Sequence, residues 1–244
     1  MKQSAILPTK YGKEVWMTEH SVTDNVERLP NWHEQLLFAE ELNECMLSGC
    51  TGYIYWYMRA HWAFVSTGEA KYGAANKTKN QLLRRAYVMS HFSKNVTGST
   101  RLGTMSSIGV KTNAAFETSA YIKGDSLIVM AIDTTQYAHD LKLKLPYAVE
   151  SGVHLLSTEQ QDRELLPLDI AEPTKEIIVS LPARSLNTYI FKLDKGALAI
   201  SDVTRTAPSQ PATYYDLHGR RLDQPRGLVI ERTPDGKSRK LLFR

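Results

Sequence analysis

The sequence predicts an α/β region, then an all-β region, then a small β tail. In residues 1–97, two short runs rich in aromatic and β-branched residues alternate with two longer runs of helical periodicity. From 98 to 195, short runs of period two are separated by Gly, Pro, Asn and Asp, which is typical of antiparallel strands. Residues 196–244 contain a proline-bearing linker and three turn motifs. We therefore expect three parts with these limits.

Four elements are expected in the first part. Residues 13–18 predict a strand, and residues 31–48 predict an amphipathic helix with apolar side chains at spacings of three and four. Residues 51–58 predict a second strand, and residues 81–96 a second helix. Strands that alternate with helices in this way pair in parallel through right-handed crossovers. Two such βα units do not make a stable domain alone, because a closed barrel needs eight.

The second part predicts an antiparallel β-sandwich, because alternation of apolar and polar residues buries one face of each strand. The tail predicts three short strands around the turns HG, PRG and PDG. The strands expected in the sandwich are 106–110, 116–122, 126–132, 140–145, 153–158, 176–181 and 187–193.

The excess positive charge of the chain lies in its C-terminal tail. The net charge is +4, and residues 196–244 alone hold nine Lys or Arg against five Asp or Glu, so the remainder is balanced. A basic solvated terminus is common, so we expect no nucleic-acid partner. No stretch of eighteen apolar residues occurs, which predicts no membrane span, and residues 1–8 do not have the pattern of a signal peptide.

No metal or cofactor signature is present. The two cysteines, Cys45 and Cys50, lack the spacing and partners of a zinc site, and no phosphate-binding glycine loop occurs. The cysteines are either two free thiols or a disulfide, and a disulfide would need their Cα atoms within about 7 Å. We expect no cofactor.

Five segments, in order along the chain, resemble family-30 glycoside hydrolases of the xylanase type. VWMTEH resembles that family's seventh barrel strand, GYIYWYMR its eighth strand and RAYVMSHFSK its eighth helix. SAYIKGDSLIVMAI and LPARSLNTYIFKL resemble its side β-domain. The resemblance covers residues 12 to 194. It implies the last two βα units of a (β/α)8 TIM barrel, followed by an antiparallel β-sandwich side domain.

The resemblance makes Glu19 the catalytic nucleophile of a retaining enzyme. A carboxylate at the C-terminal end of a barrel strand lies at the mouth of the barrel. Retaining hydrolysis also needs a second carboxyl group about 5–5.5 Å away, and the family carries it on a fourth strand that this chain does not contain. The alternative for Glu19 is an ordinary solvated glutamate. This chain alone is therefore expected to hydrolyse its substrate poorly.

Further substrate-binding residues follow from the same motifs. Trp56 is expected to form a sugar-stacking floor, with a core tryptophan as the alternative. Tyr55 is also expected to bind substrate. Tyr55 and Tyr57 alternate with Trp56 across the strand, so at least one of these aromatics faces away from the site. His20 is expected to orient Glu19 by a hydrogen bond, although a structural role is equally consistent with its position.

The sequence departs from the glucuronate-dependent pattern of the family after the second strand. Arg59 is kept, but Ala60 stands where a second arginine grips glucuronate, and Trp62 and Ser21 replace expected tyrosines. Alanine cannot form the two-pronged guanidinium–carboxylate contact. We therefore expect an enzyme that does not require glucuronate. The alternative for Arg59 is a structural ion pair.

The substrate implied is the polysaccharide xylan. Two other functions stay open: a non-catalytic carbohydrate-binding module, and a family-30 enzyme acting on another β-linked glycan. The tail, residues 214–244, resembles C-terminal tails of secreted proteins of Bacteroidota through residues 215–222, 226–230 and 236–242. This resemblance implies secretion or attachment to the cell envelope, with a plain β extension as the alternative. Exposed surfaces of the partial barrel predict self-association.

Overall fold

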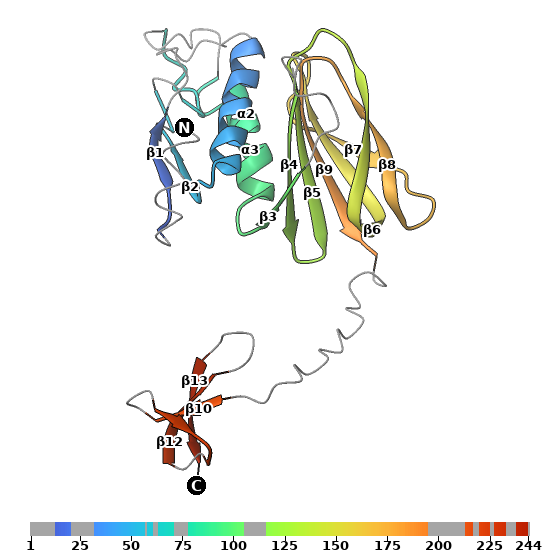
Figure 1. Cartoon of the computed structure of the whole chain (residues 1–244). Helices are drawn as coiled ribbons and strands as arrows, with labels where there is room; N and C mark the ends of the chain where they lie inside the picture. Colours follow the sequence, from blue (N-terminus) through green and yellow to red (C-terminus); the bar gives the residue numbers. More distant parts are fainter. Residues whose placement is uncertain are drawn as a thin grey trace. The chain divides into compact units, whose positions relative to one another are not determined.

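The computed structural model forms two compact units, Met1–Leu198 and Ala199–Arg244 (Figure 1). Ten stretches of the chain are described: 13–20, 32–56, 58–60, 63–70, 78–104, 116–194, 213–216, 220–224, 227–232 and 238–243. The limits 1–97, 98–195 and 196–244 stay predictions.

The first unit begins with two strands and two helices in alternation. Strand β1 (Trp16–His20) and strand β2 (Gly52–Tyr55) pair in parallel, which confirms the predicted pairing. Helix α2 (Trp32–Leu47) follows β1, and helix α3 (Arg84–Asn95) follows β2. The first strand reaches further than expected, to His20, so Glu19 lies within the strand rather than after it.

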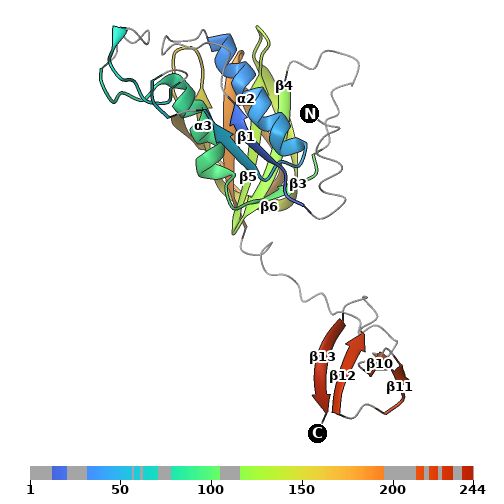
Figure 2. The ribbon, with the colours of Figure 1, turned by 90° about the vertical axis from the view of Figure 1, so that its left-hand side faces the viewer.

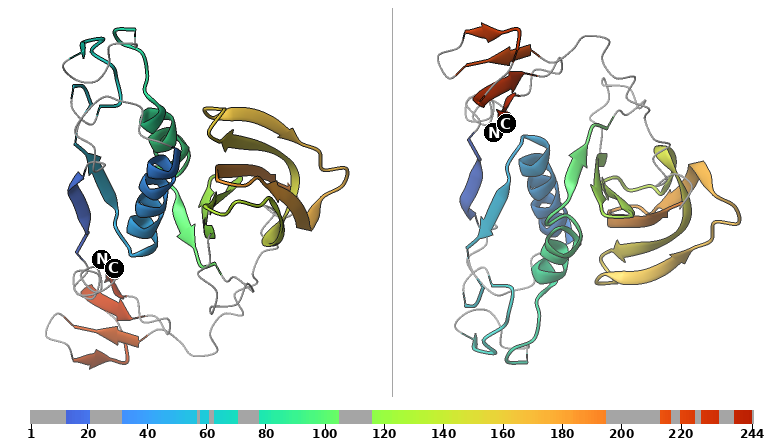
Figure 3. Two further views of the ribbon diagram at one scale, coloured as in Figure 1. Left: turned by 90° about the horizontal axis from the view of Figure 1, so that it is seen from above. Right: turned by 90° about the horizontal axis from the view of Figure 1, so that it is seen from below.

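The two helices pack between this strand pair and a larger sheet (Figures 1 and 3). Trp32, Leu36, Ala39 and Leu42 recur at helical spacing, so they share the buried face of α2. They join Val88 and Phe92 of α3, Tyr55 of β2, and side chains of the larger sheet in one core. The helices are therefore held by burial on both sides.

The larger sheet has seven strands, all antiparallel. Its order is β3-β4-β5-β9-β6-β7, and β8 pairs with another part of β6. The strands are β3 (Thr100–Leu102), β4 (Phe116–Lys123), β5 (Ser126–Asp133), β6 (His139–Ser157), β7 (Glu164–Leu168), β8 (Thr174–Leu181) and β9 (Ser185–Leu193).

One strand differs from the sequence prediction in a way that changes the topology. Two strands were expected at 140–145 and 153–158, but β6 runs through both. Its first half pairs with β8 and its second half with β9 and β7, with an irregular register between Lys144 and Val149. Pro146 lies in this irregular part, where its missing N–H costs no ladder bond. The strands therefore form one hydrogen-bonded sheet rather than two separate sheets.

The central strand β5 is buried on both faces. Ile128, Met130 and Ile132 face the helices, whereas Leu127, Val129 and Ala131 face a second core. That second core includes side chains of β6, β8 and β9, so the sheet folds over onto itself. Strands β3 and β7 were not predicted, and the strand expected at 106–110 lies outside the described residues.

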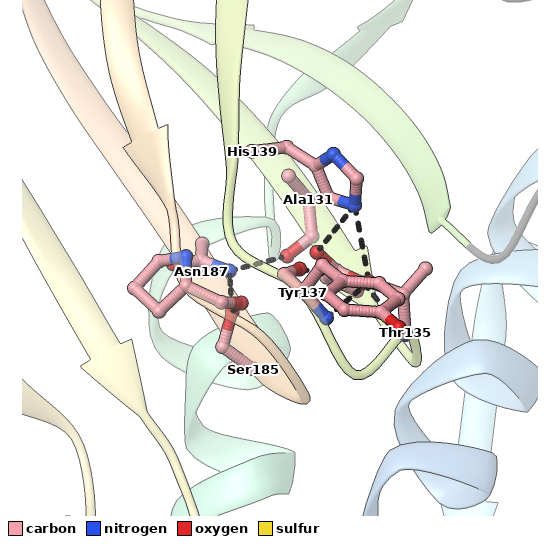
Figure 4. A network of polar contacts seen from close by, with 8 residues as sticks. Ala131, Thr135, Tyr137, His139, Ser185 and Asn187 are labelled. Carbon is pink, nitrogen blue, oxygen red and sulfur yellow. Dashed lines mark hydrogen bonds and ion pairs between the residues drawn. The ribbon is translucent and has the colours of Figure 1, made fainter.

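Buried polar groups at one end of the sheet are tied into hydrogen bonds. Asn187 donates from Nδ2 to the Ala131 carbonyl at 3.2 Å and to the Ser185 hydroxyl at 2.7 Å (Figure 4). Its Oδ1 lies 2.8 Å from His154 Nε2. Nearby, Thr135 Oγ1 lies 3.1 Å from His139 Nε2. The Asn187 contacts link β9 to β5 and β6, whereas the Thr135–His139 contact lies where the chain passes from β5 to β6.

The second unit is a four-stranded antiparallel sheet of order β11-β10-β12-β13. Three strands were expected, and each of the three predicted turns lies between two of the four strands found. The strands are β10 (Thr213–Tyr215), β11 (Arg221–Leu222), β12 (Gly227–Arg232) and β13 (Ser238–Phe243).

Candidate functional site

The C-terminal ends of β1 and β2 lie side by side. His20 is in register with Tyr55, and the Trp56 N–H donates to the His20 carbonyl at 2.7 Å. The parallel register therefore brings Glu19 and Trp56, which are far apart in the sequence, to the same end of a two-stranded sheet. Strand β1 of this sheet lies in front of the helices in Figure 2. That the strand ends carry the functional site stays a prediction.

His20 is held by two partners that sequence reasoning missed. Its Nδ1 lies 2.9 Å from the Tyr53 hydroxyl on β2, and its Nε2 lies 2.9 Å from Oε1 of Glu41 on α2. Both ring nitrogens are thus occupied, so the expected hydrogen bond from His20 to Glu19 is not formed. Because Glu41 lies 21 positions along the chain on another element, no local pattern reveals it.

The pKa values of this pair shift in opposite directions. Partial burial lowers the pKa of His20. Partial burial, followed by repulsion from Glu44, raises the pKa of Glu41 to about 7. Both shifts favour the neutral forms. The pair is therefore better described as a polar contact near neutral pH than as a permanent ion pair.

Glu19 and Trp56 are both exposed at the same end of the two-stranded sheet. His20 and Tyr53 contact each other and face α2. On β2 the neighbouring side chains Ile54 and Trp56 point the opposite way, away from α2. On β1 the register shifts between Met17 and His20, and the two residues within this irregularity, Thr18 and Glu19, are both exposed. Glu19 is exposed, Ile54 is 48% exposed and Trp56 is 46% exposed. An exposed carboxylate and an exposed indole are the side-chain types that attack and stack on a sugar, respectively.

Tyr55 does not share this open side. Its ring is buried, stacks on Phe64 at 4.3 Å between centroids, and contacts Phe38 of α2 at 5.2 Å. Its hydroxyl lies 3.5 Å from Arg85 Nη1 inside the core. Tyr55 was expected to bind substrate, but strand alternation turns it into the core because Trp56 faces the other way. Tyr57 lies outside the described residues.

The segment after β2 holds Arg59 and Ala60. Arg59 is exposed and forms an isolated parallel bridge with Val65 through its backbone. Ala60 has φ 73°, a left-handed conformation that a non-glycine residue adopts at some cost. The other two predicted site residues, Ser21 and Trp62, lie outside the described residues.

Other possible sites among the described residues are few. No group of three or more His, Cys, Asp or Glu side chains in that part of the chain could hold a metal ion. None of the described helices has both the length and the apolar character needed to cross a membrane. A hollow of about 400 Å³ lies between α2, α3 and β4, and residues that line it include Cys50, Tyr53 and Phe92.

Comparison with known proteins shows the fold but no close relative. No family model and no curated protein matches the sequence. A GH30 endoxylanase from Clostridium papyrosolvens matches with a TM-score of 0.59 and 20% identity, over 75% of this chain and 43% of that one. A family 30 subfamily 8 xylanase from Clostridium acetobutylicum matches with a TM-score of 0.61 and 24% identity, over 77% and 44%.

A third xylanase gives the same result. The catalytic domain of GH30 xylanase C from Talaromyces cellulolyticus matches with a TM-score of 0.60 and 17% identity, over 74% of this chain and 41% of that one. This chain therefore spans less than half the length of these xylanases. Over that span, its mostly-sheet first unit shares the fold of family 30 glycoside hydrolases.

Proposed function

We propose that this chain is the C-terminal part of a retaining endo-β-1,4-xylanase, with Glu19 as its nucleophile. The observation that carries this proposal is the exposure of Glu19 and Trp56 together at the C-terminal ends of two parallel strands. The fold likeness to family 30 xylanases supports it, because those enzymes are named for action on xylan. The two strands would be the seventh and eighth of a TIM barrel, and the large sheet its side domain.

The proposed chemistry begins with attack of the Glu19 carboxylate on the anomeric carbon of a xylose unit. This attack forms a covalent glycosyl-enzyme, and the leaving sugar takes a proton from a second carboxyl group. No residue of this chain is assigned as that acid. Because general acid catalysis contributes about 10²–10⁴-fold, we expect weak hydrolysis by this chain alone.

An activated substrate tests the role of the nucleophile without requiring the missing general acid. A xylobiosyl fluoride with fluorine in place of the hydroxyl next to the anomeric carbon has a leaving group that needs no proton. We expect one glycosyl group to attach to Glu19 in the full chain, detected by intact mass and peptide mapping. Glu19→Gln should abolish the adduct, whereas Glu172→Gln, at an exposed turn, should keep it. An adduct of equal yield in Glu19→Gln would contradict the assignment.

Ala60 supports a xylanase that does not require glucuronate. We expect equal retardation of the chain in gels that contain arabinoxylan or glucuronoxylan. Ala60→Arg should selectively increase retardation on glucuronoxylan, because a guanidinium pairs with a carboxylate through two hydrogen bonds. A preference of the natural sequence for glucuronoxylan of about a hundredfold or more would contradict this expectation.

A carbohydrate-binding module is the second candidate, because the open side carries two exposed indoles, Trp16 at 57% and Trp56 at 46%. In that case Glu19→Gln would leave binding to xylan unchanged and no covalent adduct would form in either protein. Action on another β-linked glycan would appear as labelling by a different glycosyl fluoride.

We also propose where the protein is located and how it assembles. We propose that the protein is secreted or attached to the cell envelope, with the four-stranded tail unit as a sorting signal. The tail forms a separate compact unit, which is consistent with a module that acts independently. Exposed apolar side chains on β1 and β2 favour self-association, which light scattering would detect.

A further inference from the structure

The end of α2 has the geometry of a Schellman cap. Gly49 adopts φ 94°, its N–H donates to the Met46 carbonyl at 3.1 Å, and the Cys50 N–H donates to the Cys45 carbonyl at 3.0 Å. One left-handed residue with these two nested hydrogen bonds defines the motif. Cys45 therefore occupies the third position from the helix end, and Cys50 the second position beyond its cap.

This motif normally brings those two side chains into contact. Here both side chains are thiols. Burial, and then the neighbouring Cys50 thiol with a hydrogen bond between the two, raises the pKa of Cys45 to about 12. The backbone bond between the same two residues also holds their Cα atoms close, as a disulfide requires. Both cysteines are reduced in the structure.

We propose that Cys45 and Cys50 are a modification site, at which exchange with a low-molecular-weight disulfide closes an intramolecular disulfide across the C-terminal cap of α2. The two halves of the pair differ in access. Cys45 is fully buried, whereas Cys50 is half-buried and lines the hollow of about 400 Å³ between α2, α3 and β4. Cys50 is therefore the thiol that meets the reagent first.

With glutathione disulfide as the oxidant, the reaction has two exchange steps. The Cys50 thiolate attacks one glutathione sulfur, the sulfur–sulfur bond of the reagent breaks, and one glutathione thiolate leaves. Cys45 then loses its proton to solvent and attacks the Cys50 sulfur, which releases the second glutathione. The two protein thiols are oxidised, and one glutathione disulfide is reduced to two glutathione molecules that take up the two protons.

The test is to incubate the folded full chain with glutathione disulfide, block remaining thiols with N-ethylmaleimide, and measure the intact mass under non-reducing conditions. We expect a monomer with no glutathione and no maleimide, and a peptide map that links Cys45 to Cys50. Cys45→Ala should instead retain one glutathione on Cys50. Retention of glutathione by the natural sequence, two alkylated thiols, or a link between two chains would overturn the proposal.

A second variant tests whether the cap itself creates the site. Gly49→Ala places a Cβ at φ 94°, which side chains of L-residues rarely adopt, so the cap should open. We expect the mixed disulfide on Cys50 to resolve at least about tenfold more slowly than in the natural sequence, with the helical circular dichroism signal retained. An unchanged rate would contradict the role of the cap. If Cys45→Ala fails to fold, Cys45→Ser serves as the second variant in which the mixed disulfide on Cys50 should persist.

Discussion

The seven-stranded sheet and the β1–β2 pair differ in how many of their faces are buried. In the sheet, β5 is covered on both faces, by the helices and by the folded-over strands. In the strand pair, only the side toward α2 is covered, and Trp16, Ile54 and Trp56 are exposed on the other. The comparison indicates that the sheet supplies most of the stability of the first unit, while the candidate chemistry lies on its least buried part.

The largest expected effect comes from breaking the second core of the sheet. Phe191 is fully buried, so Phe191→Ala should lower the free energy of unfolding by about 3–5 kcal/mol. The matched change on the strand pair, Ile54→Ala, removes a side chain that is 48% exposed and should cost less than about 1 kcal/mol. Urea unfolding of both variants measures the difference, and equal costs would contradict the comparison.

The next effect concerns the junction between α3 and the sheet. His91 is buried, with Nδ1 2.7 Å from Thr188 Oγ1 and Nε2 2.9 Å from Ser157 Oγ. Burial first, and then the charge of Arg163, lowers its pKa to about 3. The Ser157 hydroxyl oxygen also accepts a hydrogen bond from the backbone N–H of Arg163. Its own O–H is then available to donate to an unprotonated Nε2, so this contact favours the neutral form of His91.

The sign of the resulting pH dependence follows from the lowered pKa. The unfolded state binds the proton of His91 more tightly, so this stability is present above pH 6.5 and is lost as the pH falls toward 3. Between pH 7 and pH 5 we expect a loss of about 2 kcal/mol from His91. His91→Gln should remove that part of the slope, measured by urea unfolding at both pH values. An identical slope in the variant would contradict the assignment.

The smallest effect is on the strand pair and has the opposite sign. The pKa of Glu41 is raised from 4.5 to about 7, so its contribution to stability is present below pH 4.5 and is lost as the pH rises through 7. Glu41→Gln should therefore gain melting temperature relative to the natural sequence at pH 8 but not at pH 5. The gain should be small because the side chain is still 21% exposed, so solvent screens part of its charge. A gain at pH 5 of the same size would point to packing instead of charge.

The sequence predicted elements well where one local pattern decides the outcome. Helix α2 runs from 32 to 47 against an expected 31 to 48, because its apolar spacing and Gly49 are local signals. The continuous strand β6 was missed because Pro146 reads as a break, although an irregular register accommodates it. The fold-back of the sheet could not be predicted, since pairing partners lie far apart in sequence.

The candidate site was predicted only in part, because local patterns do not show which distant residues pack against it. Period-two alternation indicated that neighbouring aromatics face opposite sides, but only tertiary packing shows that Tyr55 is the buried one. The partners of His20 come from another strand and from a helix, Tyr53 and Glu41, so no motif contains them. Glu19 as the nucleophile stays a prediction, and its placement on an exposed strand end is consistent with it.

The order of strands in the sheet also affects how the protein is made. Strand β5 pairs with β9, so its edge waits for Leu193 to be synthesised. At ribosomal speeds of about 5–20 residues per second, this delay is on the order of 3–12 s. During that time LIVMAI has the β4 hairpin on one edge and the earlier helices on one face. Its other edge and the side chains of Leu127, Val129 and Ala131 still lack their β9 partners. The nascent chain therefore exposes an unpaired apolar strand edge for several seconds. We expect it to bind chaperones that recognise extended apolar segments during that time.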